Sequence, residues 1–322
     1  MRIQFHGARG SHALCTIPHR VQQIVRNVWE FGQKQGIKDW ASLERALSEK
    51  PRSFYQIYGG NTTCIELKSD LAPMPTFFDA GTGITAAGID PFSSLAHPDY
   101  TVGKGKVAIF FSHTHWDHIL GLLTLEQLYK GNEFHFYSVH KNLSQRIANL
   151  FIEEHFPVPY RMVEPHIKYS QIALGEQIKF GGLKIDHIPQ SHPGGSFAYR
   201  VSDGIKSFVF ATDTELKNVD PPHMTPGKNL YTNADVLILD AQFSAEDYQS
   251  REGFGHADLF TAVDFAVRES AKRLYLFHQS PYYDDQQVDE QLLRAREYLK
   301  KKFGAQNPLK IEMTVEGDEI EV

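Results

Sequence analysis

Residues 112–118 read SHTHWDH, and they follow directly on the apolar stretch KVAIFF. Such a stretch is typical of a buried strand, so we expect the heptapeptide to lie at a strand end. Because alternate residues of a strand project the same way, His113, His115 and Asp117 are predicted to converge, while His118 points elsewhere at the start of a helix. One segment would then offer ligands to two adjacent metal ions. The pattern His-x-His-x-Asp-His arises by chance only roughly 0.002 times in a chain of this composition, so it predicts a metal site.

Further metal ligands are predicted where other apolar stretches end. His192 follows residues 183–189, Asp213 follows SFVFAT, and His278 follows RLYLF. A scaffold commonly presents functional groups at such positions, although a lone histidine at a strand end is more often a structural residue. Together with the heptapeptide they supply five imidazoles and two carboxylates. That set suits zinc, manganese or iron, and not magnesium or calcium.

The rest of the chain alternates strand-like and helix-like segments. Strands are predicted at residues 106–112, 134–139, 183–189, 196–202, 207–212, 235–242 and 273–278, and helices at 120–129, 143–155, 257–270 and 288–302. This order predicts a single α/β domain over residues 1–322, with strands in two sheets and helices outside them.

Residues 15–58 carry no strand pattern and look inserted. Apolar residues from Val21 to Trp29 fall on one helical face, Gly36 suits a helix end, and Asp39 suits the N-cap of a second helix. We therefore expect a helical hairpin here. It is either a surface addition or a lid or dimer arm over a nearby site.

Composition narrows the classes of function. The 322 residues include 33 Lys and Arg against 39 Asp and Glu, a formal charge of −6, which argues against a nucleic-acid-coating surface. Two cysteines cannot form a disulfide framework. No apolar run approaches the ~18 residues needed to cross a bilayer. No signal-peptide stretch begins the sequence, so a reducing, cytoplasmic setting without a membrane partner is predicted.

These motifs resemble those of the metallo-β-lactamase fold superfamily. The resemblance extends to GARGS at residues 7–11, YGGNTTC at 58–64, FDAGTG at 78–83 and the pair Gly255-His256. It implies a four-layer αββα sandwich with a dinuclear site at the edge of two sheets, and residues 15–58 are the one large departure. By the family pattern His113, His115 and His192 would hold one metal, Asp117, His118 and His278 the other, and Asp213 would bridge them.

The resemblance also implies hydrolysis, since a Glu in place of His115 would have indicated a redox diiron branch. The intervals around Asp213 are too short for the insertions of the large nucleases or for a tRNA-gripping arm. Residues Asp240 and His256 resemble the acidic strand and His-bearing loop of ribonuclease Z. Asp240 could orient His256, and His256 could protonate a leaving alkoxide. Alternatively, Asp240 caps a turn and His256 only begins a helix. Asp117, Asp240 and His256 are thus the predicted catalytic residues.

The function predicted on this basis is hydrolysis of cyclic nucleotides or similar small phosphodiesters by a hydroxide that bridges two divalent metals, with zinc the first choice. Arg9, Asn61 and His256 would contact the substrate at the rim, although Arg9 suits a surface ion pair equally well. Asp79 would brace a ligand histidine or cap a turn. The two metals would leave a local positive charge that favours an anionic substrate.

Three alternatives remain open at this point. The chain could be a lactone or thioester hydrolase with the same metals, an RNA-processing nuclease related to ribonuclease Z, or a metal-binding module without catalysis. Tyr282 and Tyr283 could stack on a base or pack at the rim. The insertion makes a homodimer plausible, with one subunit helping to cover the other's site.

Overall fold

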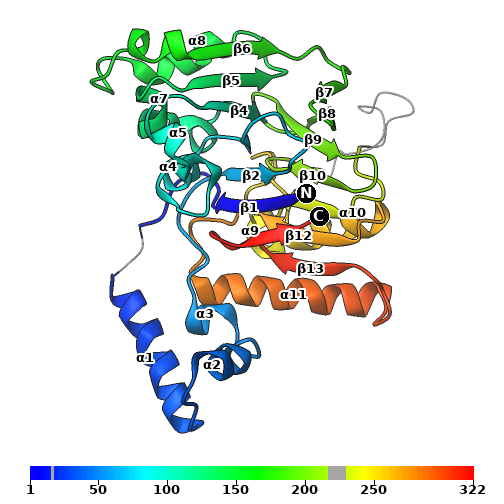
Figure 1. Ribbon diagram of the computed structural model, residues 1–322. Helices are drawn as coiled ribbons and strands as arrows, with labels where there is room; N and C mark the ends of the chain where they lie inside the picture. The colour runs from blue at the N-terminus through cyan, green and yellow to red at the C-terminus, as the bar shows by residue number, and fades with distance from the viewer. Residues whose placement is uncertain (16–17, 217–229) are drawn as a thin grey trace.

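Two sheets packed face to face form the body of the protein (Figure 1). The computed structural model describes residues 1–15, 18–216 and 230–322. The first sheet has the strand order β14-β1-β2-β3-β4-β5-β6 and the second β13-β12-β11-β10-β9-β8-β7. The strands are β1 (Arg2–Gly7), β2 (Cys64–Lys68), β3 (Thr76–Phe78), β4 (Lys106–Phe111), β5 (Glu133–Ser138), β6 (Ile167–Gln171), β7 (Ile178–Phe180), β8 (Leu183–Gln190), β9 (Ser196–Ser202), β10 (Ser207–Ala211), β11 (Val236–Asp240), β12 (Arg273–Phe277), β13 (Lys310–Met313) and β14 (Glu319–Glu321).

Helices cover the outer faces of both sheets and fill the connections between strands (Figure 1). The α-helices are α1 (Pro18–Lys34), α2 (Trp40–Leu47), α3 (Arg52–Tyr55), α4 (Thr82–Ile89), α5 (Pro98–Thr101), α6 (Trp116–Ile119), α7 (Glu126–Tyr129), α8 (Leu143–Ala148), α9 (Ala245–Tyr248), α10 (Leu259–Arg268) and α11 (Asp285–Phe303). Short 3₁₀ helices are η1 (Ser94–Ala96), η2 (Leu120–Leu123), η3 (Asn149–Phe151), η4 (Tyr160–Met162) and η5 (Glu164–His166).

Three apolar layers join these elements. In the middle layer Phe78 of β3 contacts Tyr199 of β9 and Phe208 of β10 across the two sheets, with ring centroids 5.7 and 5.8 Å apart. On β4, Phe110 faces this middle layer while Ile109 faces the helices outside the first sheet. Strands buried on both faces read as continuous apolar runs. A third layer joins the second sheet to α10 and α11. The predicted four-layer αββα sandwich is therefore confirmed.

The topology brings several strand ends to one place. Strands β3 to β6 run parallel in the first sheet, and β10 to β13 run parallel in the second. Parallel strands end at the same edge of a sheet, and ligands of open α/β sheets bind beyond such carboxyl ends. The segments that follow β3, β4, β8, β10, β11 and β12 carry the candidate site residues described below.

The inserted helices α1 to α3 extend from the sandwich beneath α11 (Figure 1). Asp289 of α11 holds α3 in place, since its carboxylate accepts hydrogen bonds from the backbone N–H groups of Arg52 at 3.1 Å and Ser53 at 2.9 Å. As predicted, the Asp39 side chain caps α2. On α1 most of the apolar face is uncovered, with Trp29 67% exposed. Residues 16 and 17 of the predicted insertion lie outside the described residues.

Two of the predicted helices are wrong in extent. The helix expected at residues 120–129 is split into η2 and α7, because the Gly121 backbone packs on the turn at residues 80–81 and donates to the Ala80 carbonyl at 3.0 Å. The helix expected at residues 143–155 ends at Ala148 and continues only as η3. The sequence did not predict seven of the observed strands, which are β1, β2, β3, β6, β7, β13 and β14. Among the described residues no helix is long and apolar enough to cross a membrane.

Candidate metal centre

The heptapeptide divides between two clusters because the chain turns into a helix inside it. Helix α6 begins at Trp116, directly after the N-cap residue His115. Strand β4 already ends at Phe111, so strand alternation does not reach Asp117, and the Asp117 carboxylate lies with the His118 ring. The expectation that Asp117 would join His113 and His115, with His118 apart, is wrong for this reason.

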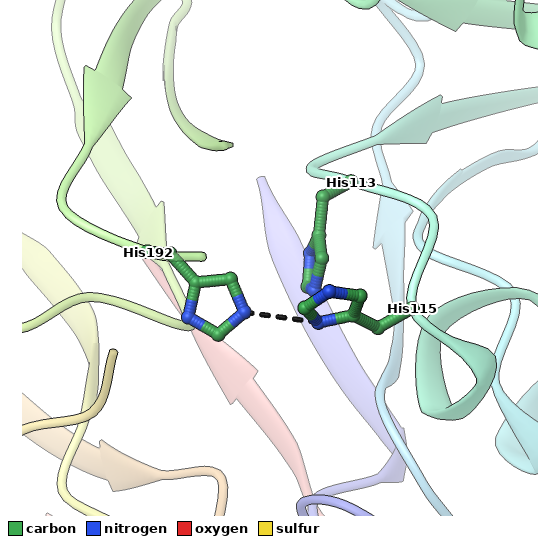
Figure 2. Close-up of side chains that lie close together, drawn as sticks. All are labelled: His113, His115 and His192. Carbon is green, nitrogen blue, oxygen red and sulfur yellow. Dashed lines mark hydrogen bonds between the residues drawn. The ribbon is translucent and has the colours of Figure 1, made fainter. Parts of the chain in front are cut away.

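The first cluster consists of three imidazoles, and we call it the open cluster. The ligand nitrogens of His113, His115 and His192 lie within 4.8 Å of one another. Figure 2 shows the rings turned toward one point, with Nε2 of His192 3.0 Å from Nδ1 of His115. The buried Nε2 of His113 has no hydrogen-bonding partner among the described residues. Imidazole nitrogens gathered in this way suit a bound transition metal.

The second cluster contains two carboxylates and two imidazoles, and we call it the buried cluster. Asp117, His118, Asp213 and His278 are all buried, and their ligand atoms lie within 4.8 Å of one another. Nε2 of His118 lies 3.3 Å from the Asp117 carboxylate and 3.1 Å from that of Asp213. Nε2 of His278 lies 3.1 Å from the Asp117 carboxylate.

Asp213 connects the two clusters. Its Oδ1 lies 3.7 Å from Nε2 of His113 and 3.6 Å from Nε2 of His192, on the open side. Its Oδ2 lies 3.1 Å from Nε2 of His118 and 3.3 Å from Nε2 of His278, on the buried side. One carboxylate with an oxygen turned toward each cluster has the geometry required of a bridging ligand.

Further residues fix the orientation of these ligands. Asp79, which is fully buried, accepts from Nδ1 of His118 at 2.8 Å and from the Ser112 backbone N–H at 2.7 Å. The Ser11 backbone N–H donates to Asp117 Oδ2 at 2.7 Å. Nδ1 of His192 bonds the Gly255 carbonyl at 2.9 Å. Such contacts set the tautomer and angle of a metal-binding histidine. Ser11 gave no signal in sequence, since it acts through its backbone. The Ser112 hydroxyl, which sequence reasoning also missed, donates to Asp79 at 2.6 Å and lies 3.0 Å from Nδ1 of His113.

Electrostatics distinguish the two clusters. Burial lowers the pKa of His192 and His115 below the ordinary histidine value, and it lowers that of His113 further, with the help of His118. Burial alone would also lower the pKa of His118, but Asp213, Asp117 and Asp79 raise it well above 6.5. Although burial opposes ionisation, the neighbouring histidines keep the pKa of the Asp213 carboxyl well below 3.8.

The residues present fit two divalent transition metals. Ionised carboxylates are costly to bury unless a cation accompanies them. In the metal-free protein, a proton on His118 supplies the positive charge that accompanies these carboxylates. The orphaned Nε2 of His113 and the unbonded Nε2 of His118 are the nitrogens that would bind metal. Five imidazoles and two carboxylates favour zinc, manganese or iron over magnesium or calcium.

A third group of titratable residues adjoins the buried cluster. The Asp240 carboxylate, at the end of β11, bonds Nδ1 of His256 at 2.8 Å and also accepts from the backbone N–H of Asp213 at 3.0 Å. The His256 ring stacks on that of His278 with centroids 4.9 Å apart. Burial would lower the pKa of His256, but Asp240 outweighs it and raises that pKa above 6.5. The pairing of Asp240 with His256 expected from the sequence is present, and Asp240 also accepts from the Ala257 backbone N–H at 3.1 Å, as a capping residue would.

Two of the three predicted substrate-binding residues, Arg9 and Asn61, have other partners. Arg9 is 3% exposed, and its guanidinium donates to the carbonyls of Gly59, Ser280 and Tyr283. Asn61 donates to Glu316 and accepts from the Thr82 hydroxyl. Both side chains therefore tie loops together in this structure. The ion pair considered as the alternative is present, since the Arg9 guanidinium lies 3.7 Å from the Asp285 carboxylate, but it is buried and not at the surface.

Comparisons with known proteins agree with this architecture. A family model described as "Beta-lactamase superfamily domain" matches residues 77–279, which include all seven candidate metal ligands. Ribonuclease Z of Bacillus cereus (strain G9842) is 29% identical over 214 residues, which cover 60% of this chain and 62% of the relative. The match thus spans less than two thirds of the relative's own length.

Two solved structures share the fold over its full extent. Yeast PDE1, in its unliganded form, superposes with a TM-score of 0.63 and 12% identity, covering 100% of this chain and 99% of that one. The short form of human tRNase Z superposes with a TM-score of 0.60 and 15% identity, covering 100% and 99%. At these identities the likeness shows a shared fold.

Proposed function

Because the chain belongs to the beta-lactamase superfamily, we propose that it is a metal-dependent hydrolase of small phosphodiesters, with cyclic nucleotides the leading candidates. The observation that carries this proposal is the His256–Asp240 pair beside the buried cluster, with Nδ1 of His256 held at 2.8 Å. Ribose oxygens are poor leaving groups, and a positioned general acid is what their departure requires.

Each residue of the site then has a chemical role. His113, His115 and His192 would hold one metal, Asp117, His118 and His278 the other, and Asp213 would contact both. Bound there, the metals would supply an activated water nucleophile and neutralise charge on the phosphoryl oxygens. Asp79 fixes His118, and Asp240 keeps Nδ1 of His256 occupied. The transferable proton of His256 is therefore carried on Nε2, which delivers it to the leaving oxygen.

RNA processing is the second candidate, because the Bacillus cereus relative is named ribonuclease Z. The formal charge of −6 weighs against it, since RNA-binding surfaces are usually basic. A lactone or thioester hydrolase of the same fold would have less need of His256, because its leaving groups depart more readily.

The proposal also covers the metal, the cellular compartment and the oligomeric state. Zinc is the metal we propose first, and manganese or iron would fit the same ligands. Unpaired Cys15 and Cys64 accord with a reducing, cytoplasmic setting. The exposed apolar residues of α1 accord with a homodimer formed through the insertion, residues 15–58.

The test is a substrate panel with zinc or manganese: 3′,5′-cyclic mononucleotides, cyclic dinucleotides, bis(p-nitrophenyl) phosphate, a precursor tRNA, a lactone and a thioester. We expect hydrolysis of the small phosphodiesters. His256→Ala should lower kcat for cyclic nucleotides by on the order of 10²-fold or more. It should affect bis(p-nitrophenyl) phosphate far less, because nitrophenolate leaves without a proton. His155→Ala, which removes an exposed histidine, is the matched control.

Turnover of the lactone or thioester alone would overturn the proposal, and turnover of the precursor tRNA alone would favour the second candidate. Equal losses on both phosphodiesters in His256→Ala would remove its role as proton donor.

A further inference from the structure

A pocket of about 340 Å³ lies beside the metal centre, between the insertion and the loop that follows β12. Leu14, directly before the insertion, and Cys15 and Ile57, at its two ends, line one side of the pocket. Pro281 and Tyr282 line it from the loop. Its volume is at the small end of the range for ligand sites, which is about 300–1,000 Å³. It has room for one ring system and its sugar, and not for an oligonucleotide.

A single short segment, residues 9–12, separates this pocket from the metal centre. Arg9 lines the pocket. A Cβ on the next residue, Gly10, would lie 2.4 Å from the ring of His278, so the backbone here rests on a candidate metal ligand. The backbone N–H of Ser11 bonds the Asp117 carboxylate at 2.7 Å. The pocket and the buried cluster therefore lie on the two sides of this one segment.

The polar groups of the pocket do not suit a phosphate. The Arg9 guanidinium is occupied by three backbone carbonyls. The Arg20 guanidinium donates to the Ser53 carbonyl at 2.8 Å and lies 3.4 Å from the Asp285 carboxylate. Asp284 and Asp285 themselves line the pocket and would repel an anion.

The apolar walls suit a flat ring. Tyr282 is 73% exposed, so much of its ring is accessible for stacking, and that ring stands at 80° to the ring of His12 with centroids 5.7 Å apart. Stacking of a base on an aromatic side chain stabilises binding by about 1–3 kcal/mol and tolerates any base, because every base has a π-face.

We propose that this pocket binds the heterocyclic base of a nucleotide substrate, stacked on Tyr282 and enclosed by Leu14 and Ile57, while the phosphodiester lies at the metal centre. The proposal rests on the proposed function and names its substrate class. It also gives the insertion a role, since the two ends of that segment form one wall of the base site.

The experiment compares cyclic AMP and cyclic CMP with ribose 3,5-cyclic phosphate, which has the same phosphodiester and no base. Ile57→Trp fills the pocket, and Tyr282→Ala removes the stacking surface without touching the core. Both variants should raise KM for the two nucleotides at least about tenfold, as the loss of one stacked base implies. They should leave kcat, and kcat/KM for the baseless substrate, within about threefold. Phe92→Ala, a similarly exposed aromatic residue outside the pocket, should change neither.

Unchanged KM values for the nucleotides, or an equal loss on the baseless substrate, would overturn the base site. The effect on KM also separates these variants from His256→Ala, which acts on kcat. Should the wild-type protein hydrolyse no phosphodiester, the proposed function fails, and calorimetric titration with adenosine and cytidine still decides the pocket. Binding that Ile57→Trp abolishes would support it, and no binding to the wild-type protein would overturn it.

Discussion

The open and buried clusters lie side by side, yet they are built differently. In the open cluster His115 is exposed and His192 partly exposed, and His192 is fixed by a single backbone carbonyl, that of Gly255. In the buried cluster every ligand is buried. Asp79 accepts a hydrogen bond from His118, and the Ser11 backbone N–H donates one to Asp117. The open cluster carries only neutral imidazoles, whereas the buried cluster carries two carboxylates.

This difference predicts an order of metal binding. Buried carboxylates need a cation, and ligands held by further hydrogen bonds lose little freedom when the metal arrives. The buried cluster should therefore bind its metal first and more tightly, and the open cluster should lose its metal first on dialysis. Four predictions test this comparison.

The largest effect is expected at the residue that belongs to both clusters. Asp213 has a left-handed backbone, with φ of 56°, which asparagine tolerates. Asp213→Asn should therefore fold but lose the bridging charge. We expect metal content to fall at both clusters and activity to drop on the order of 10³-fold or more. Elemental analysis measures the metal content and steady-state kinetics measure the activity. Asp70→Asn, at an exposed position, is the control. Loss of only one metal would show that Asp213 does not bridge.

A smaller effect, greatest at the buried cluster, is expected from Asp79→Asn. Asp79 also has a left-handed φ, 59°, so the backbone again tolerates asparagine. His118 would lose the carboxylate that orients its ring, which typically costs 10–100-fold in metal affinity. Titration with zinc should show the tighter site weakened most. The weaker site should lose less affinity, because Asp79 reaches His113 only through the Ser112 hydroxyl. An equal loss at both sites would contradict the separation of the clusters.

The open cluster is tested by Gly255→Ala. Gly255 has φ of 87°, and a Cβ there would lie 2.3 Å from Nδ1 of His192. Alanine in this backbone region costs about 1–3 kcal/mol of folding stability. Because the added Cβ would displace the His192 ring, we expect a loss of about tenfold in affinity for the second metal alone. Near-ultraviolet circular dichroism of the metal-free variant would check that the fold is intact. If the tighter site were weakened instead, the open cluster and not the buried cluster would be the tighter site.

The seven candidate ligands could be predicted from sequence because each follows an apolar strand run or stands in the heptapeptide. Their conformations could not. The backbone is left-handed at three site residues, Asp79, Asp213 and His278, with φ between 56° and 61°. The sequence alone does not predict this conformation at these positions. Arg9 was misjudged because its partners, the carbonyls of Ser280 and Tyr283, are 271 and 274 residues away in sequence.

The same limit explains the strands that the sequence did not reveal. Strand β1 carries Gln4 and His6, both buried, so its hydropathy pattern reads as half exposed. His6 is paired with Glu66 at 2.8 Å and Gln4 with Asp90 at 2.9 Å. Buried polar groups are tolerated where such partners exist, and these partners become neighbours only when the sheet has formed.

The smallest expected effect is a difference in pH dependence between the clusters. Asp213, Asp117 and Asp79 raise the pKa of His118 well above 6.5 in the metal-free protein, so a metal must displace its proton. Affinity at the buried cluster should then rise with pH below that raised pKa, by up to about tenfold per pH unit. Burial lowers the pKa values of His113, His115 and His192 below 6.5. These residues are already neutral at pH 7, so affinity at the open cluster should stay nearly constant between about pH 7 and 8.

Zinc titrations in buffers of different ionisation enthalpy count the protons released. We expect release of about one proton at the tighter site and none at the weaker one. Equal release at both sites would mean that the carboxylates do not hold a proton on His118. The buried cluster would then differ from the open one only in its exposure to solvent.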